Sequence, residues 1–278
     1  MTDQLPSVPA GQDSFGAAAL KRVHDADRFH QRSGPVRPNT RSFLKNTILS
    51  AIPLPGLAAI GELLEPIALR ERMVLQEPRR HPDYVYFIES GLVSLRIVAA
   101  GAILETALIG HTGAVGASLL VGGHLATHQS VVLFPGGAHR IRVEDLRRIA
   151  REQPELREQL LRYLQALTVH CAQAGLCGVR HDREKRLACW LCLASDALDA
   201  DALPVTHDYL SSVMGLRRAG VTETLIRFEQ QGLIQKMRGM LHIEERQRLE
   251  QKACNCYKLI SAGYASTECS VSTFDSMS

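Results

Sequence analysis

The stretch THDYLSSVMGLRRAGVTETLIRFEQQGLIQKMRGMLHI, residues 206–243, decides the fold of the C-terminal part of the chain. Thr206 is of a residue type that caps helix N-termini, and Gly215 supplies a tight turn after a short helix. A second helix is expected from about Arg217 to Gln231. Two helices joined by a glycine turn are the pattern of a helix-turn-helix motif.

The second helix of this stretch has two different faces. Val221, Leu225 and Phe228 lie at i, i+4 and i+7, so they are expected to face the protein core. The N-terminal end of such a helix enters the major groove of DNA, where Arg hydrogen-bonds guanine and Thr contacts a phosphate or a thymine methyl group. Arg218 is therefore expected to read a base. The candidate DNA-binding residues of this helix are Arg217, Arg218, Thr222 and Glu223.

Residues 233–243 follow Gly232 and have the pattern of a two-stranded hairpin with Gly239 in its turn. Such a hairpin is the wing of a winged helix-turn-helix. Lys236 and Arg238 are expected to contact phosphates irrespective of sequence. Residues 181–250 are therefore predicted to be a DNA-binding domain, followed by a C-terminal tail over residues 251–278.

Residues 74–143 contain short runs of β-branched and aromatic residues that are separated by Gly and Pro, such as residues 84–88 and 92–98. Regularly spaced short strands predict a sandwich or jelly roll. The fold class is thus α+β, with an N-terminal β-roll sensor domain over residues 41–148. Residues 1–40 lack a sustained apolar period and predict a flexible arm.

A long helix is predicted over residues 149–180, with Pro154 at the start of its main part. Apolar residues along it alternate spacings of four and three, which is typical of a two-stranded coiled coil. Because fewer than three heptads are present, the alternative of a helix packed on its own β-roll stays open. The predicted dimer interface consists of Leu160, Leu164, Leu167, Cys171 and Ala174.

The sequence resembles the Crp/Fnr family of bacterial transcription factors in several segments. They are residues 83–94 (DYVYFIESGLVS), 183–191 (REKRLACWL), 214–222 (MGLRRAGVT) and 229–234. The resemblance covers roughly residues 43–250. It implies a β-roll sensor, a dimerisation helix and a winged helix-turn-helix in that order. It also implies a homodimeric, non-enzymatic transcription regulator whose partners are double-stranded DNA and RNA polymerase.

The sequence departs from the cyclic-nucleotide-binding members of this family at the ligand-binding turn. Those members use a Glu for the ribose and an Arg for the cyclic phosphate, whereas residues 115–120 read VGASLL and residues 126–130 read ATHQS. A buried phosphate without a cationic partner is costly. Cyclic AMP and cyclic GMP are therefore not expected as ligands, and the sequence does not identify another effector.

Cysteines and histidines give weaker signals. Residues 1–170 lack the cysteine cluster by which oxygen-sensing relatives bind iron and sulfur, and Cys189 and Cys192 are expected to be buried hydrophobic residues. Cys254 and Cys256 could join Cys269 in a soft-metal site, but a fourth ligand is not evident. No metal or cofactor is therefore predicted.

Two other classes of protein compete with a regulator. A metal-dependent, cupin-like jelly roll could use His111, His124 and His128, although a tight His-x-His pair with a downstream Glu is missing. A β-roll scaffold that binds only protein is the other alternative. No Ser/His/Asp arrangement or phosphate-binding Gly loop supports another reaction.

Composition agrees with a two-domain globular protein. The 278 residues are 45% hydrophobic and 22% charged, and the formal net charge of +3 permits a nucleic-acid partner without requiring one. The apolar runs are shorter than a membrane span, and the N-terminal sequence lacks the pattern of a signal peptide. We therefore expect a cytoplasmic protein with reduced thiols.

Overall fold

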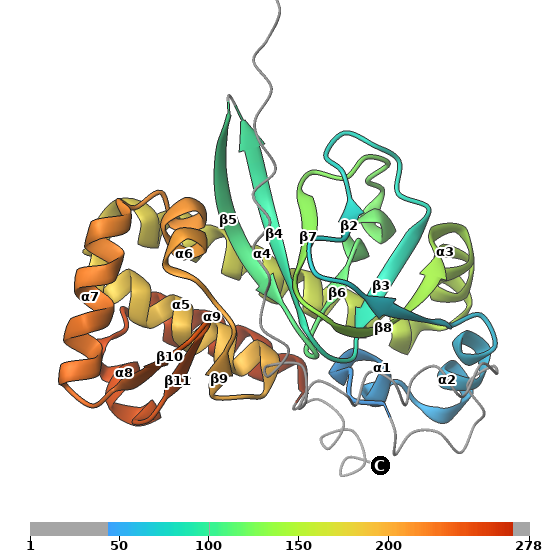
Figure 1. Cartoon of the computed structure of the whole chain (residues 1–278). Coiled ribbons are helices and arrows are strands. Elements are labelled where there is room, and N and C mark those ends of the chain that lie inside the picture. The colour runs from blue at the N-terminus through green and yellow to red at the C-terminus, as the bar shows by residue number, and fades with distance from the viewer. Residues whose placement is uncertain (1–43, 100, 269–278) are drawn as a thin grey trace, which may run out of the picture. The chain divides into compact units, whose positions relative to one another are not determined.

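A computed structural model of the chain describes residues 44–99 and 101–268 (Figure 1). The predicted N-terminal arm, residues 1–40, and Cys269 lie outside the described residues. None of the helices in the described part of the chain has both the length and the apolar composition of a membrane span.

The N-terminal half consists mainly of two four-stranded antiparallel sheets, with strand orders β1-β8-β3-β6 and β2-β7-β4-β5 (Figure 1). We call residues 65–142 the β-roll, and this double sheet agrees with the predicted β-rich domain. Its strands are β1 (Glu65–Leu69), β2 (Val74–Gln76), β3 (Tyr84–Ile88), β4 (Leu92–Ala99), β5 (Ala102–Ile109), β6 (Ala114–Val115), β7 (Gln129–Phe134) and β8 (Gly136–Arg142), with the short helix η4 (Ala117–Val121) between β6 and β7.

Strand β3 shows why the β-roll buries two cores. Because side chains alternate across a strand, Val85 and Phe87 pack with the helices that flank the sheet, while Tyr86 and Ile88 pack between the two sheets. All four side chains are buried. A strand that is apolar on both faces is therefore the centre of the domain.

Two short helices, α1 (Thr47–Ala51) and α2 (Leu54–Gly61), precede the β-roll. The Asn46 side chain caps α1 by accepting from the Leu49 amide at 3.1 Å. Its Nδ2 atom donates to the carbonyl oxygens of Ile88 and Gly113, both at 2.9 Å. These bonds satisfy a fully buried polar side chain and fix α1 to the β-roll.

Helix α3 (Val143–Glu152) and the 27-residue helix α4 (Pro154–Arg180) follow the β-roll, and Pro154 opens α4 as predicted. Leu160, which is 1% exposed, lies in the core that the flanking helices share with the β-roll. Leu164 and Leu167 are half-buried against the same core. Of the predicted dimer seam, Leu160 is thus covered by the chain itself, whereas the other four residues are partly exposed. An exposed stripe lies beside this seam on α4 and consists of Leu161, Gln165, Thr168, Ala172, Leu176 and Val179.

The C-terminal part begins with α5 (Arg183–Leu198) and forms a small winged domain. Its other elements are β9 (Ala202–Leu203), α6 (His207–Met214), α7 (Arg218–Gln230), β10 (Ile234–Met237), β11 (Met240–Ile243) and α8 (Arg246–Lys252). Strand β11 pairs with both β10 and β9, so the predicted hairpin is part of a three-stranded sheet in which β11 is the central strand.

Residues 255–268 form a helix, α9 (Asn255–Glu268), where the sequence analysis expected a tail. This helix packs along α4. The Gln159 side chain donates to the Thr267 carbonyl oxygen at 2.9 Å, and His170 and the Tyr264 hydroxyl form a hydrogen bond of 3.1 Å. Helix α9 therefore covers one side of the long helix. Burial lowers the pKa of His170 to about 4.

Candidate nucleic-acid interface

The turn between α6 and α7 sets the position of the second helix. Thr206 caps α6 by accepting from the Tyr209 amide at 3.2 Å, and Gly215 ends α6 in the left-handed conformation, with φ of +60°. A positive φ favours glycine because it has no Cβ atom. Both features of the predicted helix-turn-helix are thus confirmed.

Helix α7 buries one face and exposes the other. Val221, Leu225 and Phe228 are fully buried, as their spacing predicted. Arg217 precedes the helix at the N-cap position, and both Arg217 and Arg218 are exposed. Two arginines and the free amides of the first helical turn therefore make this end of α7 electropositive.

Arg218 forms an ion pair on the surface. Its Nε atom lies 2.8 Å from Oδ1 of Asp208 on α6, and the Arg218 side chain is 69% exposed. An ion pair between exposed side chains contributes little to stability. Arg218 can therefore exchange this partner for another acceptor at small cost.

Thr222 lies one helical turn further along α7 and is half-buried. Its hydroxyl forms a hydrogen bond of 2.9 Å with Nδ1 of His207. Burial lowers the pKa of His207, and the nearby charges of Lys236 and Arg218 lower it further. The His207 ring therefore orients the Thr222 hydroxyl.

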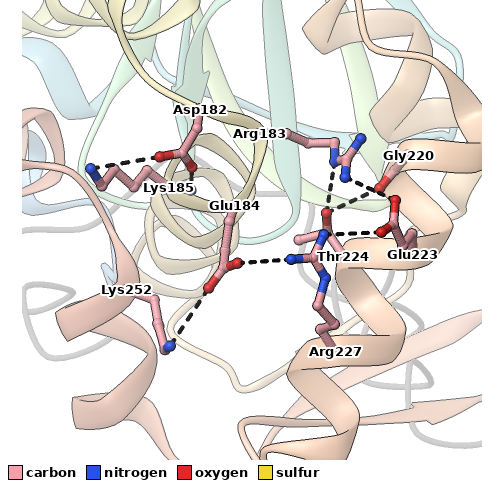
Figure 2. Close-up of polar contacts among 9 residues, drawn as sticks. All are labelled: Asp182, Arg183, Glu184, Lys185, Gly220, Glu223, Thr224, Arg227 and Lys252. Atoms are coloured by element: carbon pink, nitrogen blue, oxygen red, sulfur yellow. Dashed lines mark hydrogen bonds and ion pairs between the residues drawn. The ribbon is translucent and has the colours of Figure 1, made fainter.

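Glu223 takes part in a network of ion pairs between α5 and α7, which Figure 2 shows. Its carboxylate accepts from Arg183 at 3.0 Å and from Arg227 at 3.3 Å. Arg227 also lies 3.6 Å from the carboxylate of Glu184, and Lys252 lies 3.6 Å from the same residue. Glu223 thus already holds two arginines, which sequence reasoning did not anticipate.

Arg183 also holds α7 through a second contact that the sequence analysis missed. Its Nε atom donates to the Thr224 hydroxyl at 2.9 Å, and this hydroxyl donates to the Gly220 carbonyl oxygen at 3.0 Å (Figure 2). A Cβ atom at Gly220 would lie 2.3 Å from Nη1 of Arg183. The only sequence signal for this packing is a glycine inside an otherwise regular helix.

The wing presents its charges differently. Arg238 is exposed at the hairpin turn beside Gly239, whose φ is +74°. Lys236 is half-buried, and its Nζ atom lies 2.7 Å from Oε2 of Glu229. Hydrogen bonds from the side chain and the backbone amide of Lys236 lower the pKa of Glu229. Of the two predicted wing residues, Arg238 is thus the more accessible.

Comparison with known families identifies this part of the chain. Residues 185–252 match the family described as the Crp-like helix-turn-helix domain. These residues form a Crp-like helix-turn-helix domain. The match includes α7 and the wing, so all six predicted DNA-binding residues lie inside it. No curated protein sequence matches the chain.

Solved structures extend the likeness to most of the described chain. FixK2 from Bradyrhizobium japonicum is 17% identical, with a TM-score of 0.61 that covers 69% of this chain and 98% of that one. CLP from Xanthomonas campestris, a c-di-GMP-responsive global regulator, is 13% identical, with a TM-score of 0.54 and coverage of 69% and 99%. TTHB099 from Thermus thermophilus, a transcriptional regulator of the CRP family, is 16% identical, with a TM-score of 0.52 and coverage of 67% and 96%. The predicted resemblance is thus confirmed in the fold and in the Crp-like domain.

The Crp-like domain contacts the β4–β5 hairpin through a buried carboxylate. Glu105 on β5 accepts from the Tyr209 hydroxyl at 2.6 Å and from the Trp190 indole nitrogen at 2.5 Å. The Ser94 hydroxyl also donates to it. Burial raises the pKa of Glu105, although these donors oppose the shift. The sequence did not indicate this contact, because Trp190 and Tyr209 lie 85 and 104 residues from Glu105 along the chain.

The remaining candidate residues are scattered. His111 contacts the Ala197 carbonyl oxygen at 3.1 Å, His124 is exposed, and His128 lies 2.8 Å from the Thr127 hydroxyl. Among the described residues, none of these three histidines belongs to a group that could hold a metal ion. The cupin-like alternative therefore gains no support.

The buried cysteines lie in one region, the apolar core of the Crp-like domain. Cys189 and Cys192 are buried in this core, where the Cys189 thiol also contacts the thiols of Cys177 and Cys254. Burial raises the pKa of Cys192 to about 12. Cys254 and Cys256 come together with Cys177 and His181. Sequence reasoning did not select Cys177 or His181. The only signal was their spacing of four residues at the end of the predicted long helix.

Proposed function

We propose that the protein is a sequence-specific, DNA-binding transcription regulator of the Crp/Fnr type that acts as a homodimer. One observation carries the proposal: Arg217 and Arg218 are exposed at the N-terminal end of α7, directly after the glycine turn of a Crp-like domain. In helix-turn-helix proteins this end of the second helix reads base edges in the major groove.

The residues of the interface have separate roles in this proposal. Arg218 leaves Asp208 and reads a guanine edge, while Arg217 and the wing residue Arg238 bind phosphates. Thr222, oriented by His207, contacts a phosphate or a thymine methyl group. Lys236 and Glu223 lie at the margin of the interface, because both already hold partners within the domain.

Dimerisation follows from the presence of one recognition helix per chain, since a two-fold site needs two half-sites roughly 34 Å apart. We place the interface on the exposed stripe of α4 that begins at Leu161. Its spacings of four and three, and the 84% exposure of Val179, support this choice. Leu164, Cys171 and Ala174 of the predicted seam are half-buried and flank the stripe.

The β-roll acts as the sensor, and we propose that its ligand is neither cyclic AMP nor cyclic GMP. Ala117 is buried at the turn where a ribose-binding Glu would stand. The nearby Arg147 guanidinium donates to the carbonyl oxygens of Leu119 and Gly123, so these donors are already engaged. By the resemblance, the regulator works in the cytoplasm with RNA polymerase as its partner.

Electrophoretic mobility shifts with fragments of the source genome test the function. We expect selective retention of fragments that contain a two-fold repeat, and affinity that falls steeply with salt because phosphate contacts release counterions. Random DNA of the same length is the control. Equal affinity for all fragments, or affinity that does not change with salt, would contradict the proposal.

A further inference from the structure

Four metal-binding side chains from distant parts of the chain converge at the C-terminal end of α4. Cys177 and His181 lie one turn apart at the end of this helix, while Cys254 and Cys256 flank the start of α9. We call these four residues the thiol–imidazole cluster. The three cysteines are buried and His181 is half-buried. Within the described parts of the chain, no other group of three or more such residues lies this close together.

Two distances in the cluster match the edges of a coordination tetrahedron. The Sγ atoms of Cys177 and Cys254 are 3.5 Å apart, and Sγ of Cys256 lies 3.7 Å from Nδ1 of His181. All four ligand atoms lie within 4.8 Å of one another. Ligands bound to zinc at about 2.0–2.3 Å in a tetrahedron are separated from each other by about 3.5–3.8 Å. One ion at the centre can therefore bind all four side chains with little rearrangement.

The composition of the cluster selects the kind of ion. Three thiols and one imidazole are soft or borderline ligands, which favour zinc-like cations over magnesium or calcium. Closed sites with four protein ligands are typical of structural metals, because no position remains open for a substrate. The surroundings agree, since Cys254 and Cys256 belong to a region of buried apolar side chains.

We propose that the thiol–imidazole cluster is a tetrahedral site for one thiophilic divalent cation of the zinc type. The ion binds as the three thiols release their protons, and it joins the α8–α9 junction to the end of α4. His181 immediately precedes Asp182, which caps α5. The bound ion therefore fixes the segment where α4 passes into the Crp-like domain, together with the helix that covers α4. This inference is independent of DNA binding.

Metal analysis of the full-length protein is the first test. After purification without chelator from zinc-supplemented cells, we expect about one zinc ion per chain. Cys177→Ser should lose the ion, whereas Cys171→Ser, on the same helix and outside the cluster, should keep it. His181→Ala is a second variant, because a half-exposed residue at a helix end can be replaced without disturbing the core. Wild-type protein with no more zinc than Cys177→Ser would overturn the proposal.

Cobalt titration of the metal-stripped, reduced protein tests the geometry without any variant. Tetrahedral cobalt with thiolate ligands absorbs visible light strongly, and we expect this absorption to saturate at about one equivalent and to disappear when zinc is added. Absorption that never appears would refute the site. So would a disulfide between Cys177 and Cys254 in protein isolated without reductant, because it would assign the cluster to redox chemistry.

Thermal unfolding gives a readout of the structural role. A ligand that binds only the folded state stabilises it, so a chelator should lower the Tm of the wild type. The Tm of His181→Ala should not respond to the chelator, while Cys171→Ser should respond like the wild type. Equal responses of wild type and His181→Ala would show that the chelator acts elsewhere.

Discussion

Helices α4 and α7 each bury one face, but their exposed faces differ in chemistry. The exposed stripe of α4 includes the apolar side chains of Leu161, Leu176 and Val179, whereas the exposed end of α7 carries Arg217 and Arg218. An apolar stripe on a long helix is suited to another helix, and an arginine pair at a helix N-terminus is suited to phosphates and base edges. Both helices are amphipathic, so amphipathicity does not tell their partners apart. The contrast teaches that the exposed residue types do, since apolar side chains suit another helix and arginines suit DNA.

The largest expected effect comes from charging the α4 stripe. Leu161→Glu combined with Val179→Glu should give monomers, because it places like charges in an apolar seam. Loss of the second half-site should then weaken specific DNA binding by about 100-fold or more. Sedimentation velocity and mobility shifts measure the two effects. The matched control, Leu125→Glu in an exposed loop, should stay dimeric, and a dimeric double variant would move the interface away from α4.

Arg218→Ala tests base reading at the other helix. We expect specific affinity to fall by about 1–3 kcal/mol, with a relaxed preference at one base position of each half-site. Because Arg218 is exposed and its pair with Asp208 contributes little, the free energy of unfolding should hardly change. Binding to a library of randomised half-sites measures the preference. An equal loss on specific and random DNA would mean that Arg218 contacts only phosphate.

Gly220→Ala tests how α7 is held. Alanine normally stabilises a helix interior relative to glycine by roughly 0.5–1 kcal/mol. At Gly220 its Cβ atom would displace Arg183 from Thr224 and Glu223, so we expect a net loss of about 1 kcal/mol. Gly178→Ala, where nothing lies within 4 Å of the added atom, is the matched control and should gain stability. Chemical denaturation compares them, and equal gains would mean that Arg183 does not hold α7 in place.

Arg238→Ala separates the wing from the recognition helix. Because the wing meets the sugar–phosphate backbone, we expect binding to all DNA to weaken alike, with the salt slope shallower by about one unit. Affinities measured at several salt concentrations, on specific and random DNA, give both quantities. A change of base preference would instead place the wing in a groove.

The buried carboxyl group of Glu105 should give a smaller, pH-dependent effect on thermal stability. Burial raises the pKa of Glu105, although the hydrogen bonds donated by Trp190 and Tyr209 favour the ionised carboxylate. The protonated carboxyl therefore contributes stability to the folded state relative to the ionised form. This contribution is full below the ordinary carboxyl pKa and is lost as the pH rises through the raised value. The Tm of the wild type relative to Glu105→Gln should therefore increase as the medium is acidified from neutral pH. A difference that is constant with pH would contradict the assignment.

Much of the fold was predictable from local patterns. The caps and turns at Thr206, Gly215 and Gly239 depend on backbone conformations that a few neighbouring residues impose, and the structure confirms them. The buried face of α7 follows from helical periodicity in the same way. The β-rich region was evident from its spacing, although the pairing of its strands was not.

The sequence by itself thus determined most of the elements apart from α9, and the helix that carries two arginines at its exposed end. Only the tertiary structure decided which stripe of α4 is exposed. Leu160 and Leu161 are neighbours in the sequence, and their side chains point about 100° apart around the helix. Periodicity alone does not say which of the two packs against the β-roll. The tertiary structure likewise decided that Arg183 holds Glu223 and that Cys177 meets Cys254. These partners lie 40 and 77 residues apart, and contacts at such separations come from packing and not from local pattern.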